Sequence, residues 1–102
     1  MTINKKKVSD FLNSKYGELT LGDFIRSLRE SDEISQTDFA TKLNISRANL
    51  CDIEKNRKLI SPERAARFSK ILNFPEKFFV KLAIEDLLRQ ANLKYQVELN
   101  AS

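Results

Sequence analysis

The sequence predicts an all-α fold. Only two glycines and two prolines occur among the 102 residues, and apolar positions recur at helical spacing along almost the whole chain. Residues that commonly cap helices precede most of these apolar segments. A chain of this length forms one compact domain, which excludes proteins that need two lobes.

The first two helices are predicted from their caps. A short helix is expected over residues 9–16, with Ser9 as its N-cap. The next is expected to begin after Thr20, which forms a capping pair with Asp23, and to end near Glu30.

Two helices of about eight residues follow in close succession, over residues 36–43 and 47–55. Ser35 is positioned to cap the first and Ser46 the second. Asn44 favours the left-handed conformation that ends a helix, so the second helix is expected to leave at a steep angle. Two short helices joined in this way are typical of a helix-turn-helix.

The C-terminal part is predicted to contain two further helices and a strand. Ser61-Pro62-Glu63 combines a cap, a proline at the first helical position and an acid that the helix dipole favours. The last helix is expected to begin at Pro75, and its apolar arc is wider than one core-facing stripe requires. After it, apolar and polar residues alternate, which predicts a short strand: Tyr95, Val97 and Leu99 against Lys94, Gln96 and Glu98.

The composition excludes most catalytic chemistry. The chain has no histidine and a single cysteine, Cys51, so it cannot assemble a zinc finger, a disulfide framework or a histidine-based triad. It also lacks a P-loop and a dinucleotide fingerprint. We therefore predict that the protein is not an enzyme and has no metal site and no cofactor.

The same composition bears on location. No stretch approaches the ~18 consecutive apolar residues of a membrane span, and no secretory signal is evident at the N-terminus. With a lone cysteine, a cytoplasmic location is expected.

The positive charge is concentrated in one segment. The formal net charge is +4, but residues 42–70 alone carry eight bases and three acids, which gives +5. Such a cluster favours an anionic partner. The bases are Lys42, Arg47, Lys55, Arg57, Lys58, Arg64, Arg67 and Lys70.

The stretch from Leu21-Gly22 through Leu72 contains a set of positions that match one family pattern without a gap: Ile25, Leu28-Arg29, Ser35-Gln36, Phe39-Ala40, Leu43, Ile45-Ser46, Leu50, Ile53-Glu54 and Leu72. With these residues the stretch resembles the phage-repressor (Xre/Cro-like) helix-turn-helix family. The resemblance implies a five-helix lambda-repressor-like DNA-binding bundle, whose recognition helix begins at Arg47. Residues 1–17 are then a basic helical extension, 18–74 the DNA-binding domain and 75–102 a dimerisation region.

Several positions depart from the family pattern. Asn44, Asn56 and Asn73 stand where the family usually has glycine after a helix, and asparagine is the next-best residue for a left-handed turn. Ile60 replaces the usual proline. Residues 60–65 and 74–79 are also similar to HigA-like antitoxins, which belong to the same superfamily.

The start of the predicted recognition helix carries the candidate base contacts, because that end of such a helix faces the base edges. Arg47 suits guanine, Ala48 a thymine methyl group, and Asn49 adenine or a phosphate. Asp52 either accepts from cytosine or, as we favour, orients Arg47 or Lys55. Gln36 occupies a family position that contacts a phosphate and often braces the recognition helix. A basic turn suited to the flanking DNA backbone follows that helix, formed by Lys55, Asn56, Arg57 and Lys58. Ser46, the cap of the recognition helix, completes the candidate DNA-binding residues.

Three other features have a structural interpretation beside a functional one. Arg29 and Glu54 occupy family positions that form an ion pair between helices, unless they are unrelated surface charges. Cys51 is expected to be a small, half-buried filler rather than a redox switch. The run Lys5-Lys6-Lys7 is expected to be a solvated terminus rather than an arm in the minor groove.

Two functional hypotheses follow from different classes. The first is a homodimeric transcriptional regulator that binds double-stranded DNA at an inverted repeat. Repression is favoured because no activation or ligand-binding segment is evident. The second is an antitoxin whose region from Leu82 to Leu99, or whose N-terminal extension, binds a protein toxin while the central fold represses its own operon. The apolar surplus of the last helix supports dimerisation or toxin binding.

Overall fold

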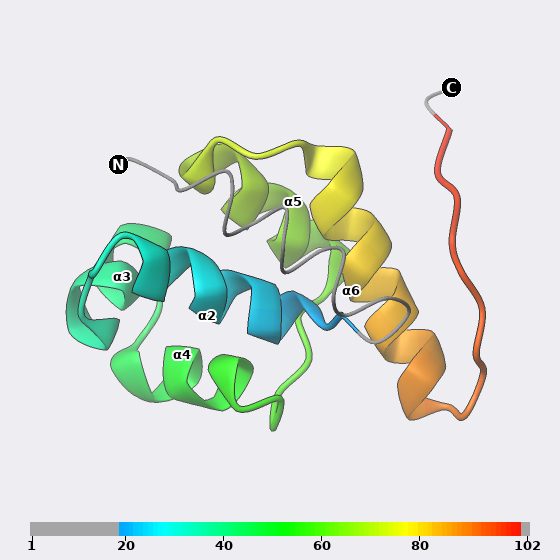
Figure 1. The fold of residues 1–102 in the computed structure, drawn as a ribbon, viewed down its shortest axis with the longest axis horizontal. Helices are drawn as coiled ribbons and strands as arrows, with labels where there is room; N and C mark the ends of the chain where they lie inside the picture. The colour runs from blue at the N-terminus through cyan, green and yellow to red at the C-terminus, as the bar shows by residue number, and fades with distance from the viewer. Residues whose placement is uncertain (1–18, 101–102) are drawn as a thin grey trace.

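In the computed structural model, which describes residues 19–100, five helices surround one core (Figure 1). The predicted helix over residues 9–16 and the lysine run of residues 5–7 lie outside the described residues. The helices are α2 (Leu21–Ser31), α3 (Gln36–Leu43), α4 (Arg47–Glu54), α5 (Pro62–Leu72) and α6 (Glu76–Gln90).

The predicted caps are confirmed. The side-chain oxygens of Thr20, Ser35, Ser46 and Ser61 each accept a hydrogen bond from the backbone N–H three residues later. These bonds satisfy N–H groups that have no partner within the helix, and they fix where each helix begins.

The asparagines that replace glycine do adopt left-handed backbone. Asn44, Asn56 and Asn73 have φ values of 60°, 59° and 59°. Asn44 and Asn73 end α3 and α5. The turn between α3 and α4 therefore keeps the geometry that the sequence predicts, without glycine.

The core forms around α2, which lies between the α3–α4 pair and the α5–α6 pair (Figure 1). Phe24 of α2 is 1% exposed and packs edge-on against the rings of Phe74, Phe78 and Phe79. Such contacts add to the stabilisation from burial itself. The aromatic cluster fixes α6 against the helix that also supports the helix-turn-helix.

The predicted strand over residues 94–99 is wrong for the single chain. Residues 93–100 form neither helix nor strand, and they turn back at the end of α6 toward its beginning (Figure 1). A strand needs a second strand to pair with, and no described segment provides one. The Val97 N–H instead donates to Glu85 Oε2 on α6, at 2.8 Å.

The wide apolar arc of α6 is divided between core and surface. Phe79, Leu82 and Ala83 are buried, whereas Leu87 is 42% exposed. Part of the apolar surplus is thus absorbed by the core. The remainder lies at the C-terminal end of the helix.

Candidate DNA-binding site

The first turn of α4 projects into solvent. Ser46, Arg47 and Ala48 are exposed and Asn49 is half-buried, while the Ser46 hydroxyl accepts from the Asn49 N–H at 3.0 Å. Leu50 on the opposite face is fully buried. Burial of one face and capping of the end hold the exposed turn in a fixed orientation.

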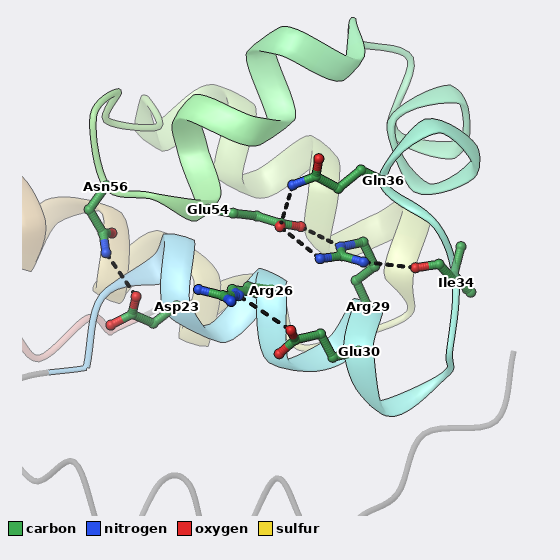
Figure 2. A network of polar contacts seen from close by, with 8 residues as sticks. All are labelled: Asp23, Arg26, Arg29, Glu30, Ile34, Gln36, Glu54 and Asn56. Carbon is green, nitrogen blue, oxygen red and sulfur yellow. Dashed lines mark hydrogen bonds and ion pairs between the residues drawn. The ribbon is translucent and has the colours of Figure 1, made fainter.

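The other end of α4 is anchored by an ion pair, as the sequence predicts. Arg29 Nε and Nη2 contact the two carboxylate oxygens of Glu54 at 2.7 and 3.0 Å, and Arg29 Nη1 donates to the carbonyl of Ile34 at 2.9 Å (Figure 2). The Glu54 side chain is only 2% exposed. The hydrogen bonds to Glu54 raise the pKa of Arg29 above its ordinary value, despite burial. A paired, fork-like contact of this kind fixes geometry as well as charge.

Gln36 belongs to the same network. Its Nε2 donates to Glu54 Oε1 at 3.0 Å (Figure 2), so the start of α3 is joined to the end of α4. The bracing role is therefore present in the structure. The predicted phosphate contact stays a prediction, and it would have to use the partly exposed remainder of this side chain.

Two candidate DNA contacts engage neighbouring side chains. Asn49 Oδ1 accepts from Lys58 Nζ at 3.2 Å. Asp52 pairs with Arg57, at 2.9 Å from Nη2 and 3.0 Å from Nε, and not with Arg47 or Lys55 as the sequence suggested. The reason is local: the chain turns back after α4, with the Arg57 N–H bonded to the Asp52 carbonyl at 2.8 Å.

Asn56 has a structural role that the sequence did not indicate. Its Oδ1 accepts from Thr20 Oγ1 and its Nδ2 donates to Asp23 Oδ1, both at 2.8 Å (Figure 2 shows the second bond). The basic turn is thereby tied to the start of α2. With both polar ends of the amide engaged, Asn56 is better described as a positioning residue than as a direct DNA contact.

Gly22 allows this close approach. A Cβ atom at this position would lie 2.2 Å from the carbonyl oxygen of Ile53 and 2.8 Å from Asn56 Oδ1. Only glycine permits α2 to touch the end of α4 at that distance. An isolated glycine inside an apolar helical pattern was the available signal for this contact.

The charge around α4 favours an anion. Its first turn has no acidic residue, whereas α2, α3, α5 and α6 each have one there. Arg47 and Lys55 are exposed and form no ion pair with any residue from 19 to 100. Free helix N–H groups and unpaired cations together attract phosphate oxygens.

Asp86 of α6 holds the start of α2, the helix that packs against α4. Its Oδ2 accepts from the Leu21 N–H at 3.0 Å and its Oδ1 from Arg89 Nη1 at 2.9 Å, so this carboxylate of α6 lies at the N-terminus of α2. Burial raises the pKa of Asp86, while these two hydrogen bonds oppose the rise. This contact joins residues that are 65 positions apart in sequence, and no local sequence pattern predicts it.

Cys51 is half-buried, with Arg57 Nη2 at 3.8 Å from its sulfur. Residues 19–100 contain no group of three or more histidine, cysteine or acidic side chains arranged to hold a metal ion. None of the described helices has the length and apolar character needed to cross a bilayer.

Fold and site together define a helix-turn-helix domain of a DNA-binding regulator: two short capped helices at a tight turn, with the start of the second exposed amid positive charge. Comparison with known families agrees, because the helix-turn-helix family matches residues 25–79. The chain belongs to this Xre/Cro-like family. No curated protein and no solved structure is significantly similar to it.

Proposed function

We propose that the protein is a homodimeric, sequence-specific DNA-binding transcriptional regulator, and that it represses by occupying an inverted-repeat operator. One observation carries the proposal: the first turn of α4 is exposed and free of acids, while Glu54 at its other end is buried in a network that fixes the helix. A rigidly held, exposed helix start is what insertion into the major groove requires.

The side chains of the first turn of α4 have different roles in the proposed complex with DNA. Arg47 donates a bidentate pair to guanine, and Ala48 contacts a thymine methyl group. Asn49 contacts adenine or a phosphate after release from Lys58. Each good bidentate contact contributes about 1–3 kcal/mol of discrimination between bases.

The basic turn after α4 binds the DNA backbone. Lys55, Arg57 and Lys58 are exposed and contact phosphates without distinguishing sequences. Asp52 remains on Arg57 and limits where its guanidinium can reach. The phosphate contacts therefore set affinity and register, whereas the turn from Arg47 sets sequence preference.

Dimerisation through residues 75–102 doubles this surface. Two recognition helices related by a two-fold axis contact half-sites about 34 Å apart, or one turn of DNA. Such a dimer binds a sequence with the same two-fold symmetry.

The proposal is tested by measuring binding to genomic DNA fragments across a salt series. Affinity is expected to differ between fragments and to fall steeply with salt, because counterions are released from phosphates. Lys58→Ala should weaken all fragments alike and reduce the slope by about one unit, whereas Arg47→Ala should relax preference at one base position. Lys70→Ala on α5 is the matched control: Lys70 pairs with Glu76 of α6, so its loss should change neither the affinity, nor the salt slope, nor the sequence preference. Equal affinity for all fragments contradicts the proposal.

An antitoxin is the second candidate. The observation that favours it is the exposed apolar surface at the end of α6 and beyond, with Leu87, Leu93 and Tyr95 at 42%, 44% and 65% exposure. A toxin bound between Leu82 and Leu99 would cover this surface; the N-terminal extension is the alternative toxin site. Purification from the native cells distinguishes the two: a second, stoichiometric small basic chain supports the antitoxin, and a homodimer alone contradicts it.

A further inference from the structure

The exposed large hydrophobic side chains of the described chain all fall within nine residues. They are Leu87, Leu93 and Tyr95, at the end of α6 and the start of the tail, residues 92–100. A groove of about 520 Å³ beside the tail is lined by Val97 and Leu99 of the tail and by Phe78 of α6. Exposed apolar side chains gathered in one segment are suited to a partner.

The backbone of the tail is unpaired on one side. Residues 94–100 make no backbone-to-backbone hydrogen bond with any described residue, and the Val97 N–H is directed at Glu85 on α6. In an extended chain successive N–H groups point to opposite sides. The tail runs as a drawn-out segment beside α6 (Figure 1), so we infer that the N–H groups of Gln96 and Glu98 lie on the side away from α6.

The tail is also symmetric in sequence. Reading outward from Gln96, apolar Tyr95 and Val97 come first on either side, then Lys94 and Glu98 with opposite charges. Leu93 and Leu99 follow, and then Asn92 and Asn100. Residues equally far from Gln96 are thus either alike or complementary.

We propose that the tail is the dimer contact: it pairs antiparallel with the tail of a second copy about a two-fold axis through Gln96. This inference deepens the homodimer of the proposed function and rests on it. In this register Lys94 faces the partner's Glu98, and Tyr95 faces the partner's Val97. Apolar pairs lie on one face and charge pairs on the other, which are the cross-strand contacts that stabilise a sheet.

Neighbouring registers lose this match. An axis through Val97 places Lys94 opposite the partner's Asn100, and an axis through Tyr95 places it opposite the partner's Gln96. Parallel pairing in register places Lys94 beside the partner's Lys94, which like-charge repulsion disfavours. Only the axis through Gln96 places Lys94 and Glu98 each opposite a residue of opposite charge. Because the even-numbered N–H groups then point toward the partner, the two copies of Gln96 also form a hydrogen-bonded pair.

The test is a charge exchange, with dimerisation of the full chain followed by analytical ultracentrifugation. Lys94→Glu and Glu98→Lys each create two like-charge pairs per dimer, so each variant alone should dissociate at least tenfold more readily than wild type. An equimolar mixture of the two variants should dimerise again, because position 94 of one chain then faces the opposite charge at position 98 of the other. A monomeric wild type, single variants that dimerise normally, or a mixture that does not recover would each overturn the proposal.

Disulfide trapping tests the register independently. In a Cys51→Ser background, Gln96→Cys places two sulfurs on the axis, across a pair whose Cα atoms lie about 5.5 Å apart, within disulfide range. Oxidation should link the dimer covalently. Asn100→Cys is the matched control and should not link, because the two copies of position 100 lie roughly 27 Å apart at 3.4 Å per residue. Linkage at position 100 and not at 96 overturns the register.

Failure of this proposal is distinguishable from failure of the proposed function. The charge variants retain the whole surface of α4, so they should still bind a DNA half-site with wild-type affinity while losing the extra affinity for the inverted repeat. A protein that dimerises through another surface would keep that extra affinity in both variants and overturn the tail contact alone.

Discussion

The ion pair between Arg29 and Glu54 gives the sharpest stability prediction. In the wild type, the Glu54 carboxylate is 2% exposed and accepts three hydrogen bonds, two from Arg29 and one from Gln36. Arg29→Ala leaves this buried charge with the Gln36 amide alone. Stranding a buried charge costs about 3–5 kcal/mol, a large share of the roughly 5–15 kcal/mol that stabilises a domain.

The measurement is urea-induced unfolding followed by far-ultraviolet circular dichroism, at several protein concentrations so that the contribution of dimerisation is separated. Arg26→Ala is the matched control on the same helix. Its pair with Glu30 spans 3.4 Å between half-exposed side chains (Figure 2), so its loss should cost less than about 1 kcal/mol.

A second variant separates the charge from the contact. Replacing both partners with apolar residues, Arg29→Met with Glu54→Leu, removes the charge together with its partner, so this double variant should be more stable than Arg29→Ala. The reasoning is refuted if Arg29→Ala costs no more than the Arg26→Ala control, or if the double variant is the less stable of the two.

Three further perturbations follow from the structure. Gly22→Ala should destabilise by about 1–3 kcal/mol in the same unfolding assay, because its Cβ would meet the Ile53 carbonyl at 2.2 Å; a gain in stability from better helix propensity would contradict this. Asn56→Gly keeps the left-handed φ of 59° but loses two side-chain hydrogen bonds, so it should cost about 0.5–1.5 kcal/mol, more than the control Asn44→Gly. Burial raises the pKa of Asp86 above 3.8, so between pH 3.8 and the raised pKa the folded chain holds a proton that the unfolded chain has released. The stability that protonated Asp86 contributes is therefore fully present below pH 3.8 and is lost as the pH rises through the raised pKa. The unfolding free energy of wild type relative to Asp86→Asn should therefore fall across that window, and a flat or rising difference would contradict the burial of this carboxylate.

The features of the fold that depend on a few adjacent residues could be predicted from the sequence. Caps at Ser35 and Ser46 and the left-handed Asn44 depend on a few adjacent residues, and the structure confirms them. The pair between Arg29 and Glu54 was predicted because it occupies family positions. These features determine the limits of α3 and α4 and the turn between them.

Two other sets of contacts between residues distant in sequence were not predicted. The Asp86 carboxylate reaches α2 across 65 residues, and the Asn56 side chain joins helices across 33 and 36 residues. The tail shows the opposite failure: a true alternating pattern predicted a strand, but a strand also needs a second strand to pair with, and residues 19–100 do not provide one. Whether residues from Arg47 onward contact bases depends on DNA and stays a prediction.

The central claim is that the first turn of α4 recognises bases and that each protein is one half of a dimer. The most direct test selects bound sequences from a random DNA pool, once with wild type and once with Arg47→Ala. Wild type should enrich an inverted repeat whose half-sites are centred about 34 Å apart, and Arg47→Ala should lose preference at one position in each half-site while keeping the rest. Enrichment of no sequence by wild type, or of the same sequence by both proteins, would contradict the claim.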